Sequence, residues 1–566
     1  PDTSRSGLET GYVAPTTENE TKLVEIWSQI FQMPEVGIHD NFFDLGGDSI
    51  ISIQIVAKAK QSGLHFSPRD IFEQQTISQI ALIADSEQIT KSEQGLVTGT
   101  VPLTPIQHWF FNQEFSHPNH WNQSLWLDVP ADVNLEALQS ALEYLSQQHD
   151  ALRSHFHQAV DGVWEQIISA DSVPLSLEFH DLIGIPETDQ EQIIKDRVNV
   201  LESTLDLGNG PLLKGVVFAL AAKEPLRLVV SCHHLVIDGV SWQPLLSDWE
   251  TAYNQITRSQ AVHLPPKTTS LKEWGEKLNT YAQSPALIEE LEYWRSDVEI
   301  YQFRPQSQVD MGKSLIHTLS HVLSEANTNN LLNEVHAAYN TNVVDLLLTA
   351  WAQAFSNLTG SDTASVMMEG HGRESELFND VDLSQTVGWF TTHYPVHVEL
   401  SETFDPGTQI KQVKELLRRI PNNGIGYGLL RYLHTKSPLA SQPEPAVLFN
   451  YLGQFDRALP ASELFTLAKP LRGSYSPNNP RTHALEVNAY IRNGQLALDV
   501  IYNTSQFETE AVQTLVDDFG NRLDMLIQHC LSSEAGGHTP SDFALADLTE
   551  EQFDRLSETL NKLDGS

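Results

Sequence analysis

The sequence predicts two folded units of different class, a small all-α unit near the N-terminus and a larger α/β unit made of two halves. Three observations lead to this prediction. Apolar residues repeat at helical spacing up to about residue 85, residues 86–100 are polar, and after Val101 short β-branched runs alternate with helical patterns. The chain of 566 residues is also too long for one hydrophobic core, because domains typically hold about 100–200 residues each.

Three helices are predicted in the small unit, which we place at residues 12–85. Thr17 can cap the first helix, whose apolar positions fall on one face: Leu23, Ile26, Trp27, Ile30 and Phe31. The second helix opens at Ser49 and stops near Gly63. The third covers residues 77–83, where apolar side chains again recur.

The larger unit mixes strands and helices. Buried strands are predicted at residues 226–232 and 446–451. Helices are predicted at residues 242–253 and 509–526, where apolar residues recur at helical spacing. A polar break with Pro265-Pro266 predicts where the two halves meet. The predicted order is therefore a linker (1–11), the helical unit (12–85), a flexible tether (86–100), the α/β unit (101–540, with halves of about 101–265 and 270–540) and a C-terminal linker or docking helix (541–566).

Composition narrows the range of partners. Acidic residues outnumber basic ones 74 to 34, for a net charge of -40, which argues against nucleic acid or an anionic membrane as partner. Cys232 and Cys530 are the only cysteines, so a disulfide framework is not expected and a reducing cytoplasm fits. No apolar run is long enough to span a bilayer, and no signal peptide is evident. The start at Pro1 predicts that the chain is an excised piece of a longer protein.

Ser49 is a candidate modification site. It lies in the sequence Gly46-Gly47-Asp48-Ser49, after two small residues and at the predicted start of a helix. A helix N-terminus favours an anionic group, so a phosphodiester on the Ser49 oxygen would be well placed. The alternative is that Asp48 or Ser49 only caps the helix, and the position of this motif inside a tethered helical unit favours modification.

With this motif, residues 12–85 resemble a peptidyl carrier domain of nonribosomal peptide synthetases, a small four-helix fold. The resemblance implies 4'-phosphopantetheine bound covalently to Ser49 by a phosphopantetheinyl transferase. The segment Tyr12-Val13-Ala14-Pro15 is similar to the linker that follows an adenylation domain, which implies such a domain upstream.

A histidine pair marks the second candidate site. His233-His234 ends the predicted strand and is followed by Asp238-Gly239, in the pattern HHxxxDG. Adjacent residues of a strand point to opposite sides, so one imidazole can face a cavity while the other is fixed in the protein. A neutral imidazole suits proton abstraction. Ordinary core or surface histidines are the alternative, and a proton-shuttling role makes a metal ion unnecessary.

The pattern HHxxxDG resembles the active-site motif of condensation and epimerization domains, which fold as two chloramphenicol-acetyltransferase-like halves in a V-shaped pseudo-dimer. Further stretches are similar to the epimerization branch: 105–111, 121–124, 369–374 (EGHGRE), 386–391, 394–395, 424–428 and 449–455. Gln385 departs from the pattern, which carries arginine there.

The resemblance implies L-to-D inversion at Cα of an aminoacyl or peptidyl residue held as a thioester on Ser49. His234 and Glu369 are the implied acid and base, either of which can abstract the proton, and burial is expected to raise the pKa of Glu369. Asn450 and Tyr451 are candidates for stabilising the enolate, with a strand core as the alternative. Five residues are implied to be structural: His233, Asp238, Gly239, His371 and Arg373.

Two other functions stay open. One is peptide-bond formation by a condensation-type domain, and the other is a catalytically silent domain that gates the carrier. For the epimerization reading, the implied partner is a downstream condensation domain that accepts the D form, in cis or in trans, and the protein is expected to be a cytoplasmic monomer without nucleic acid or membrane partners.

Overall fold

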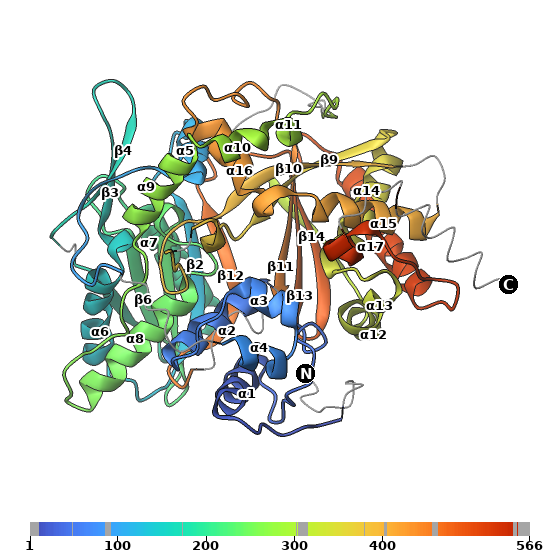
Figure 1. The fold of residues 1–566 in the computed structure, drawn as a ribbon. Helices are drawn as coiled ribbons and strands as arrows, with labels where there is room; N and C mark the ends of the chain where they lie inside the picture. The colour runs from blue at the N-terminus through green and yellow to red at the C-terminus, as the bar shows by residue number, and fades with distance from the viewer. Residues whose placement is uncertain are drawn as a thin grey trace.

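The computed structural model describes residues 11–47, 49–84, 92–171, 174–301, 303, 315–378, 380–400, 405–454, 462–546 and 552. Figure 1 shows a helical domain below a larger α/β domain. Asp48 and the side chain of Ser49 lie outside the described residues, as do residues 547–551 and 553–566 of the predicted C-terminal linker or docking helix.

The helical domain contains four helices, as the resemblance implies: α1 Glu18–Phe31, α2 Ser49–Gln61, α3 Pro68–Gln74 and α4 Ile77–Ile83. Thr17 caps α1 with a reciprocal bond from Glu20, and Gly63 follows α2 with a φ of +78°. The apolar face of α1 packs in an aromatic cluster with Phe42. Helix α3 escaped the sequence analysis because Ile71 and Phe72 are its only large apolar side chains, and two adjacent residues show no helical period.

The first half of the α/β domain is built on a five-stranded sheet. Its elements are β1 Gly99–Val101, α5 Pro105–Asn112, β2 Trp121–Val129, α6 Leu135–Gln148, β3 Ser154–Gln158, β4 Trp164–Ile168, β5 Leu177–Asp181, α7 Glu187–Ser203, β6 Leu213–Ala219, β7 Leu226–His233 and α8 Trp242–Thr257. The sheet order is β12-β2-β7-β6-β5, in which β12 is Thr466–Tyr475 from the second half. Helix α7 packs on the face that carries Val216 and Val229, while Val217 and Val230 on the other face join the main core with α6 and α8.

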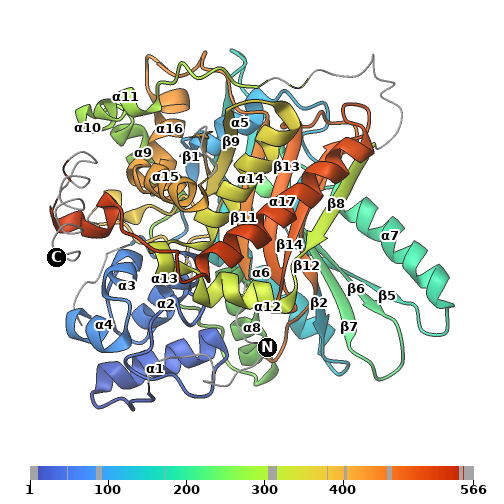
Figure 2. The same ribbon diagram turned by 90° about the vertical axis from the view of Figure 1, so that its right-hand side faces the viewer.

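The second half is built on a six-stranded sheet in the order β10-β9-β11-β13-β14-β8. The strands of this half of the chain are β8 Ile316–Val322, β9 Thr363–Gly370, β10 Thr392–Glu399, β11 Val447–Gln454, β12 Thr466–Tyr475, β13 Leu485–Arg492 and β14 Gln495–Asn503. All but β12 belong to the six-stranded sheet. Its helices are α9 Leu271–Tyr281, α10 Pro285–Glu289, α11 Leu291–Trp294, α12 Glu325–Asn329, α13 His336–Tyr339, α14 Val343–Thr359, α15 Pro406–Arg418, α16 Ile425–Gly428 and α17 Thr509–Cys530. Figure 2 shows α14 and α17 lying across one face of this sheet.

Strand β12 joins the two halves. It belongs to the second half in sequence, yet it pairs antiparallel with β2 at the edge of the first half's sheet, with Thr466 opposite Asp128 and Tyr475 opposite Trp121. One continuous hydrophobic core runs through both halves. A boundary drawn near residues 265–270 therefore separates the sequence but not the sheets.

A flexible tether was predicted at residues 86–100, and the structure differs from this prediction over residues 92–100. Val97 is buried, Gln94 bonds to the backbone of Lys267, and β1 pairs with β4. Residues 92–100 thus lie against the larger domain, because Val97 and Val101 are apolar side chains that this edge of the domain buries.

Candidate active site

The first site loop follows β7. His233 is fully buried, its Nε2 donates to the Pro118 carbonyl at 2.9 Å, and its Nδ1 accepts from the Leu235 N–H at 3.2 Å. Burial lowers the pKa of His233 to about 3, so this imidazole is neutral at physiological pH. Both nitrogens are satisfied inside the protein, which is the geometry of a structural residue.

His234 has one nitrogen bound by the backbone and one bound by Gln123. Nδ1 lies 2.7 Å from the Ile237 carbonyl oxygen and must donate to it, so in the neutral ring Nε2 carries the lone pair. The Gln123 amide nitrogen lies 3.0 Å from this Nε2. Burial lowers the pKa of His234, which keeps the ring neutral and able to accept a proton.

Asp238 accepts hydrogen bonds from residues of both halves. Its Oδ1 accepts from the backbone N–H and hydroxyl of Ser241 at 2.8 and 2.7 Å, and from Nη2 of Arg373 at 2.8 Å. Its Oδ2 accepts from the Phe390 N–H at 3.1 Å. Asp238 and Arg373 are buried, with 5% and 3% of their side chains exposed, so their charges have no access to water and depend on each other.

Gly239 differs from the other residues of the loop. A Cβ at this position would lie 3.9 Å from its nearest neighbour, a methyl group of Leu471, which is ordinary contact. The backbone there is not left-handed. The structure therefore gives no steric reason for glycine at this position.

The second site loop follows β9. A Cβ on Gly372 would lie 1.7 Å from the Phe390 carbonyl oxygen, and the residue has a φ of +67°, so only glycine fits. The His371 Nδ1 accepts from the Arg373 N–H at 3.0 Å. These contacts hold the loop that begins directly after Glu369.

Glu369 lies on β9, near His234 of the first half. Its Oε1 lies 2.9 Å from Nε2 of His393, its partner on β10. Burial pushes the pKa of Glu369 up, but the His393 bond and the nearby histidines hold it below its ordinary value. The expected raised pKa is therefore wrong, because the sequence did not show these histidines.

The sheet brings Asn450 and Glu369 together but not Tyr451. Phe449 pairs with Met368 in the parallel ladder of β11 and β9, so Asn450 comes beside Glu369. Phe449 contacts the helix side of the sheet through Trp351. Because successive residues alternate in a strand, Asn450 and Glu369 lie on the opposite face, and Tyr451 falls on the face of Phe449.

Four site residues were missed by the sequence analysis: Gln123, Trp389, His393 and His483. The Trp389 ring lies 4.3 Å from the His234 ring, and His483 adds to the field that lowers the pKa of Glu369. Gln123, Trp389 and His393 occur within or beside motifs quoted above, which was the available signal. Their partners depend on strand register, which no local pattern gives.

The helical domain docks where the second half's sheet ends. The Gln454 amide donates to the Gly46 carbonyl at 3.3 Å, the Arg69 N–H to Glu376 at 3.2 Å, and Lys60 pairs with Asp382 at 3.1 Å. Gly46 lies in the turn just before Ser49. The start of α2 is thus held beside the end of β11, the strand that carries Asn450.

Two family models match parts of this chain. A family model described as "Condensation domain" matches residues 97–549. The chain belongs to the condensation-domain family. A second model, "Phosphopantetheine attachment site", matches residues 21–82. The chain is therefore a carrier domain followed by a condensation-family domain of the nonribosomal peptide synthetase type.

Curated relatives extend over nearly the whole chain. A linear gramicidin synthase protein of Brevibacillus parabrevis is 40% identical over 98% of this chain and 11% of that protein. Surfactin synthase subunit 1 of Bacillus subtilis (strain 168) is 39% identical over 97% of this chain and 15% of that protein. Gramicidin S synthase 1 of Brevibacillus brevis is 36% identical, with 98% of this chain and 51% of that protein covered. The chain thus spans between 11% and 51% of the length of these relatives.

Solved structures confirm the fold of the condensation-family domain. The epimerization domain from the third module of tyrocidine synthetase B superposes with a TM-score of 0.71 and 36% identity, over 78% of this chain and 99% of that one. The SgcC5 protein from Streptomyces globisporus shares the fold with a TM-score of 0.60 and 18% identity, over 76% and 99%.

The carrier domain fits its covalent cofactor, 4'-phosphopantetheine. Helix α2 starts at Ser49, and the positive end of a helix dipole favours the negative charge of a phosphodiester there. A Cβ on Gly47 would lie 2.4 Å from the Phe42 ring, which explains the small residue in the turn before Ser49. Across the described ranges, we find no cluster of three His, Cys, Asp or Glu side chains that could hold a metal ion, and no helix long and apolar enough to cross a membrane.

Proposed function

We propose that the condensation-family domain is an epimerization domain, which inverts Cα of an aminoacyl or peptidyl residue carried on Ser49. The observation that carries this proposal is that Glu369 lies near His234. The two groups lie close enough that each shifts the pKa of the other. Inversion needs an acid and a base at one carbon, and these are two such groups from opposite halves.

The chemistry assigns a state to each side chain. Bound phosphopantetheine supplies a thioester, whose carbonyl acidifies the Cα proton. His234 has a neutral ring whose Nε2 lone pair can accept that proton, and Glu369 is the second proton carrier. The Asn450 amide, beside Glu369 on the same face of the sheet, is suited to donate a hydrogen bond to negative charge that develops on the substrate.

The proposal includes a modular setting. An upstream adenylation domain would select the amino acid, a phosphopantetheinyl transferase would modify Ser49, and a downstream condensation domain would accept the D form, in cis or in trans. The full length of the synthase relatives supports such a setting, because the chain covers only part of each. We expect the chain to act as a monomer.

Deuterium exchange tests the proposal. L-aminoacyl and peptidyl pantetheine groups would be installed on Ser49, the protein incubated in deuterated water, and chirality and Cα deuterium of the released residue read together. We expect mixed chirality with deuterium, reduced by about 10²- to 10⁴-fold in His234→Ala and in Glu369→Gln. Glu399→Gln, an exposed carboxyl at the far end of β10, is the matched control and should exchange normally.

The competing functions predict different products. A new peptide bond with a second loaded carrier, without exchange, would identify a condensation enzyme. Absence of both reactions with every loaded group would identify a domain that only gates the carrier.

A further inference from the structure

Glu369 is anchored by one side chain. Among the described residues, its carboxylate has a single hydrogen bond, from Nε2 of His393 to Oε1 at 2.9 Å. The two residues are directly paired across the antiparallel strands β9 and β10, so the backbone fixes their approach. The second oxygen, Oε2, has no such partner in the described part of the chain and is left for substrate.

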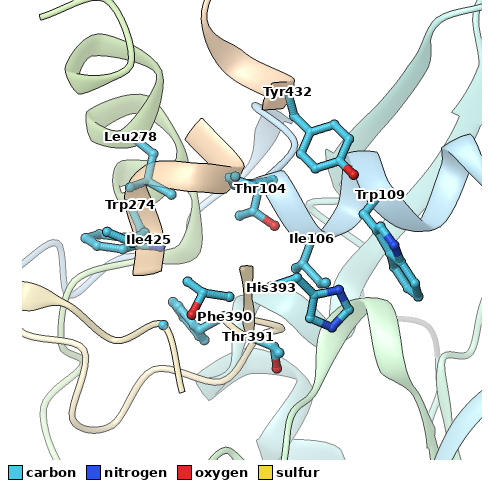
Figure 3. Close-up of a pocket in the computed structure, with 14 residues that line it drawn as sticks. Thr104, Ile106, Trp109, Trp274, Leu278, Phe390, Thr391, His393, Ile425 and Tyr432 are labelled. Carbon is cyan, nitrogen blue, oxygen red and sulfur yellow. The ribbon is translucent and has the colours of Figure 1, made fainter. Parts of the chain in front are cut away.

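His393 is itself held in place. Only 8% of its side chain is exposed, and its ring packs edge-on against Trp109 with centroids 4.8 Å apart. Figure 3 shows the two rings side by side at the edge of a small cavity. His393 lines this cavity, and its Nε2 bonds to Glu369.

The charges around Glu369 come from several elements. The titratable groups that face it are His393 on β10, His234 after β7, His483 before β13 and Tyr475 on β12. Burial lowers the pKa of His234 and His483, so both are neutral near pH 7. The positive charge of Arg481 also lowers the pKa of His483. His393 is the group among them that bonds directly to the carboxylate.

We infer that His393 is a positioning residue for Glu369, which binds Oε1 and leaves Oε2 as the oxygen that exchanges a proton with Cα. This inference rests on the proposed epimerization. In the step, ionised Glu369 takes the Cα proton on Oε2, the electron pair of the C–H bond stays on the substrate, and His393 keeps its Nε2 proton. When the proton returns, the same bond to Oε1 stabilises the carboxylate that forms.

The test compares variants that remove or keep the donor. His393→Phe removes the N–H, whereas His393→Gln retains an amide that can donate to Oε1. Deuterium exchange would be followed against pH for holo-protein loaded with the L and, separately, the D aminoacyl group. Loss of a charge-assisted bond raises the pKa of Glu369, so the acid limb of the direction in which Glu369 abstracts should move up by about one pH unit.

The matched control is His397→Phe. His397 lies four residues along β10 and makes the same kind of cross-strand bond, to Ser365 Oγ at 2.8 Å, away from Glu369. We expect His397→Phe and His393→Gln to keep the wild-type pH profile. Because His393→Phe also removes packing, a carboxyl ¹³C titration of Glu369 in the wild-type and His393→Gln proteins, assigned with Glu369→Gln, provides a second readout.

The outcomes separate the two proposals. If the wild type exchanges no deuterium, the proposed epimerization fails, and with it this inference. If the wild type exchanges and His393→Phe keeps the same pH profile in both directions, the positioning role is overturned while epimerization stands. A Glu369 pKa above the ordinary value of about 4.3 in the wild type would also overturn it.

Discussion

The amide nitrogen of Gln123 lies 3.0 Å from Nε2 of His234, and the amide oxygen of the same side chain lies 2.9 Å from Nε1 of Trp242. The indole N–H can only donate, so the Gln123 oxygen must face it and the NH₂ group must face His234. Gln123 therefore donates to the lone pair of His234. This contact favours the neutral imidazole and occupies its lone pair, so the amide must move away from Nε2 when the ring accepts a proton.

Replacing Gln123 by glutamate should move the pH dependence of exchange. A carboxylate near Nε2 favours the imidazolium and raises the pKa of His234, which burial lowers in the wild type. Base activity is present above this pKa and is lost as pH falls through it, so the loss should begin at a pH about 1–3 units higher in Gln123→Glu. The measurement is the rate of Cα deuterium uptake between pH 5 and pH 9, about two units on either side of neutral pH.

Gln113→Glu is the control for this experiment. Gln113 lies at the end of α5, where its amide donates to the Trp109 carbonyl at 3.1 Å rather than to His234. An equal change in both variants would mean that added negative charge, rather than contact with His234, alters the profile.

The Arg373–Asp238 pair should matter more for stability than any exposed pair. Arg373→Ala leaves Asp238 buried without its counter-charge, and Arg373 also donates to the Thr386 carbonyl at 2.9 Å. We expect a loss of about 3–5 kcal/mol in the free energy of unfolding of the condensation-family domain. Denaturant unfolding followed by tryptophan fluorescence provides the measurement.

A half-buried pair on the first half provides the comparison. Arg227 and Asp128 lie 2.7 Å apart, with 23% and 31% of their side chains exposed. Arg227→Ala should cost about 0–1 kcal/mol. Equal losses in the two variants would show that burial does not distinguish these pairs.

Local sequence patterns predicted many of the elements of this fold. The strand expected at 226–232 is β7, the one expected at 446–451 is β11, and the helix expected at 509–526 is α17. These predictions succeeded because apolar periodicity reports burial directly. The exchange of β12 between the sheets was not predicted, since it is a pairing between residues more than 300 positions apart.

The same distinction holds in the site. His234 and Glu369 were found because they occur in motifs, and the carrier was found because Ser49 opens a helix in a separate unit. Gln123 and His393 were missed because their roles come from strand register, which sets Gln123 opposite Cys232 and His393 opposite Glu369. Register depends on the whole sheet, so residue type alone did not assign it.

Gly47→Ala should loosen the carrier domain near Ser49. The added Cβ would meet the fully buried Phe42 ring at 2.4 Å, inside the cluster with Trp27 and Phe31. Overpacking of this kind costs about 1–3 kcal/mol. Hydrogen exchange of amides in α1 and α2 of the full chain should therefore quicken, and Gly11→Ala, whose Cβ would have open space, should leave it unchanged.

The Lys60–Asp382 ion pair is expected to stabilise docking of the carrier domain on the condensation-family domain. The nitrogen and oxygen lie 3.1 Å apart, with 27% and 8% of the side chains exposed, so the pair is partly shielded from water. Lys60→Glu and Asp382→Lys each place like charges together. We expect each to slow exchange of the carrier-bound residue by about tenfold, the equivalent of ~1.4 kcal/mol, and the double variant to recover most of the rate.

A free aminoacyl-pantetheine thioester separates docking from chemistry. Because this small substrate needs no carrier contact, its exchange should be the same in the wild type and in both single variants. Lys22→Glu changes the charge of the carrier at a pair with Glu18 within α1 and should leave both rates unchanged. If the single reversals slowed the free thioester as much as the carrier-bound residue, the ion pair would support the site itself, and docking would depend on the backbone contacts of Gly46 and Arg69.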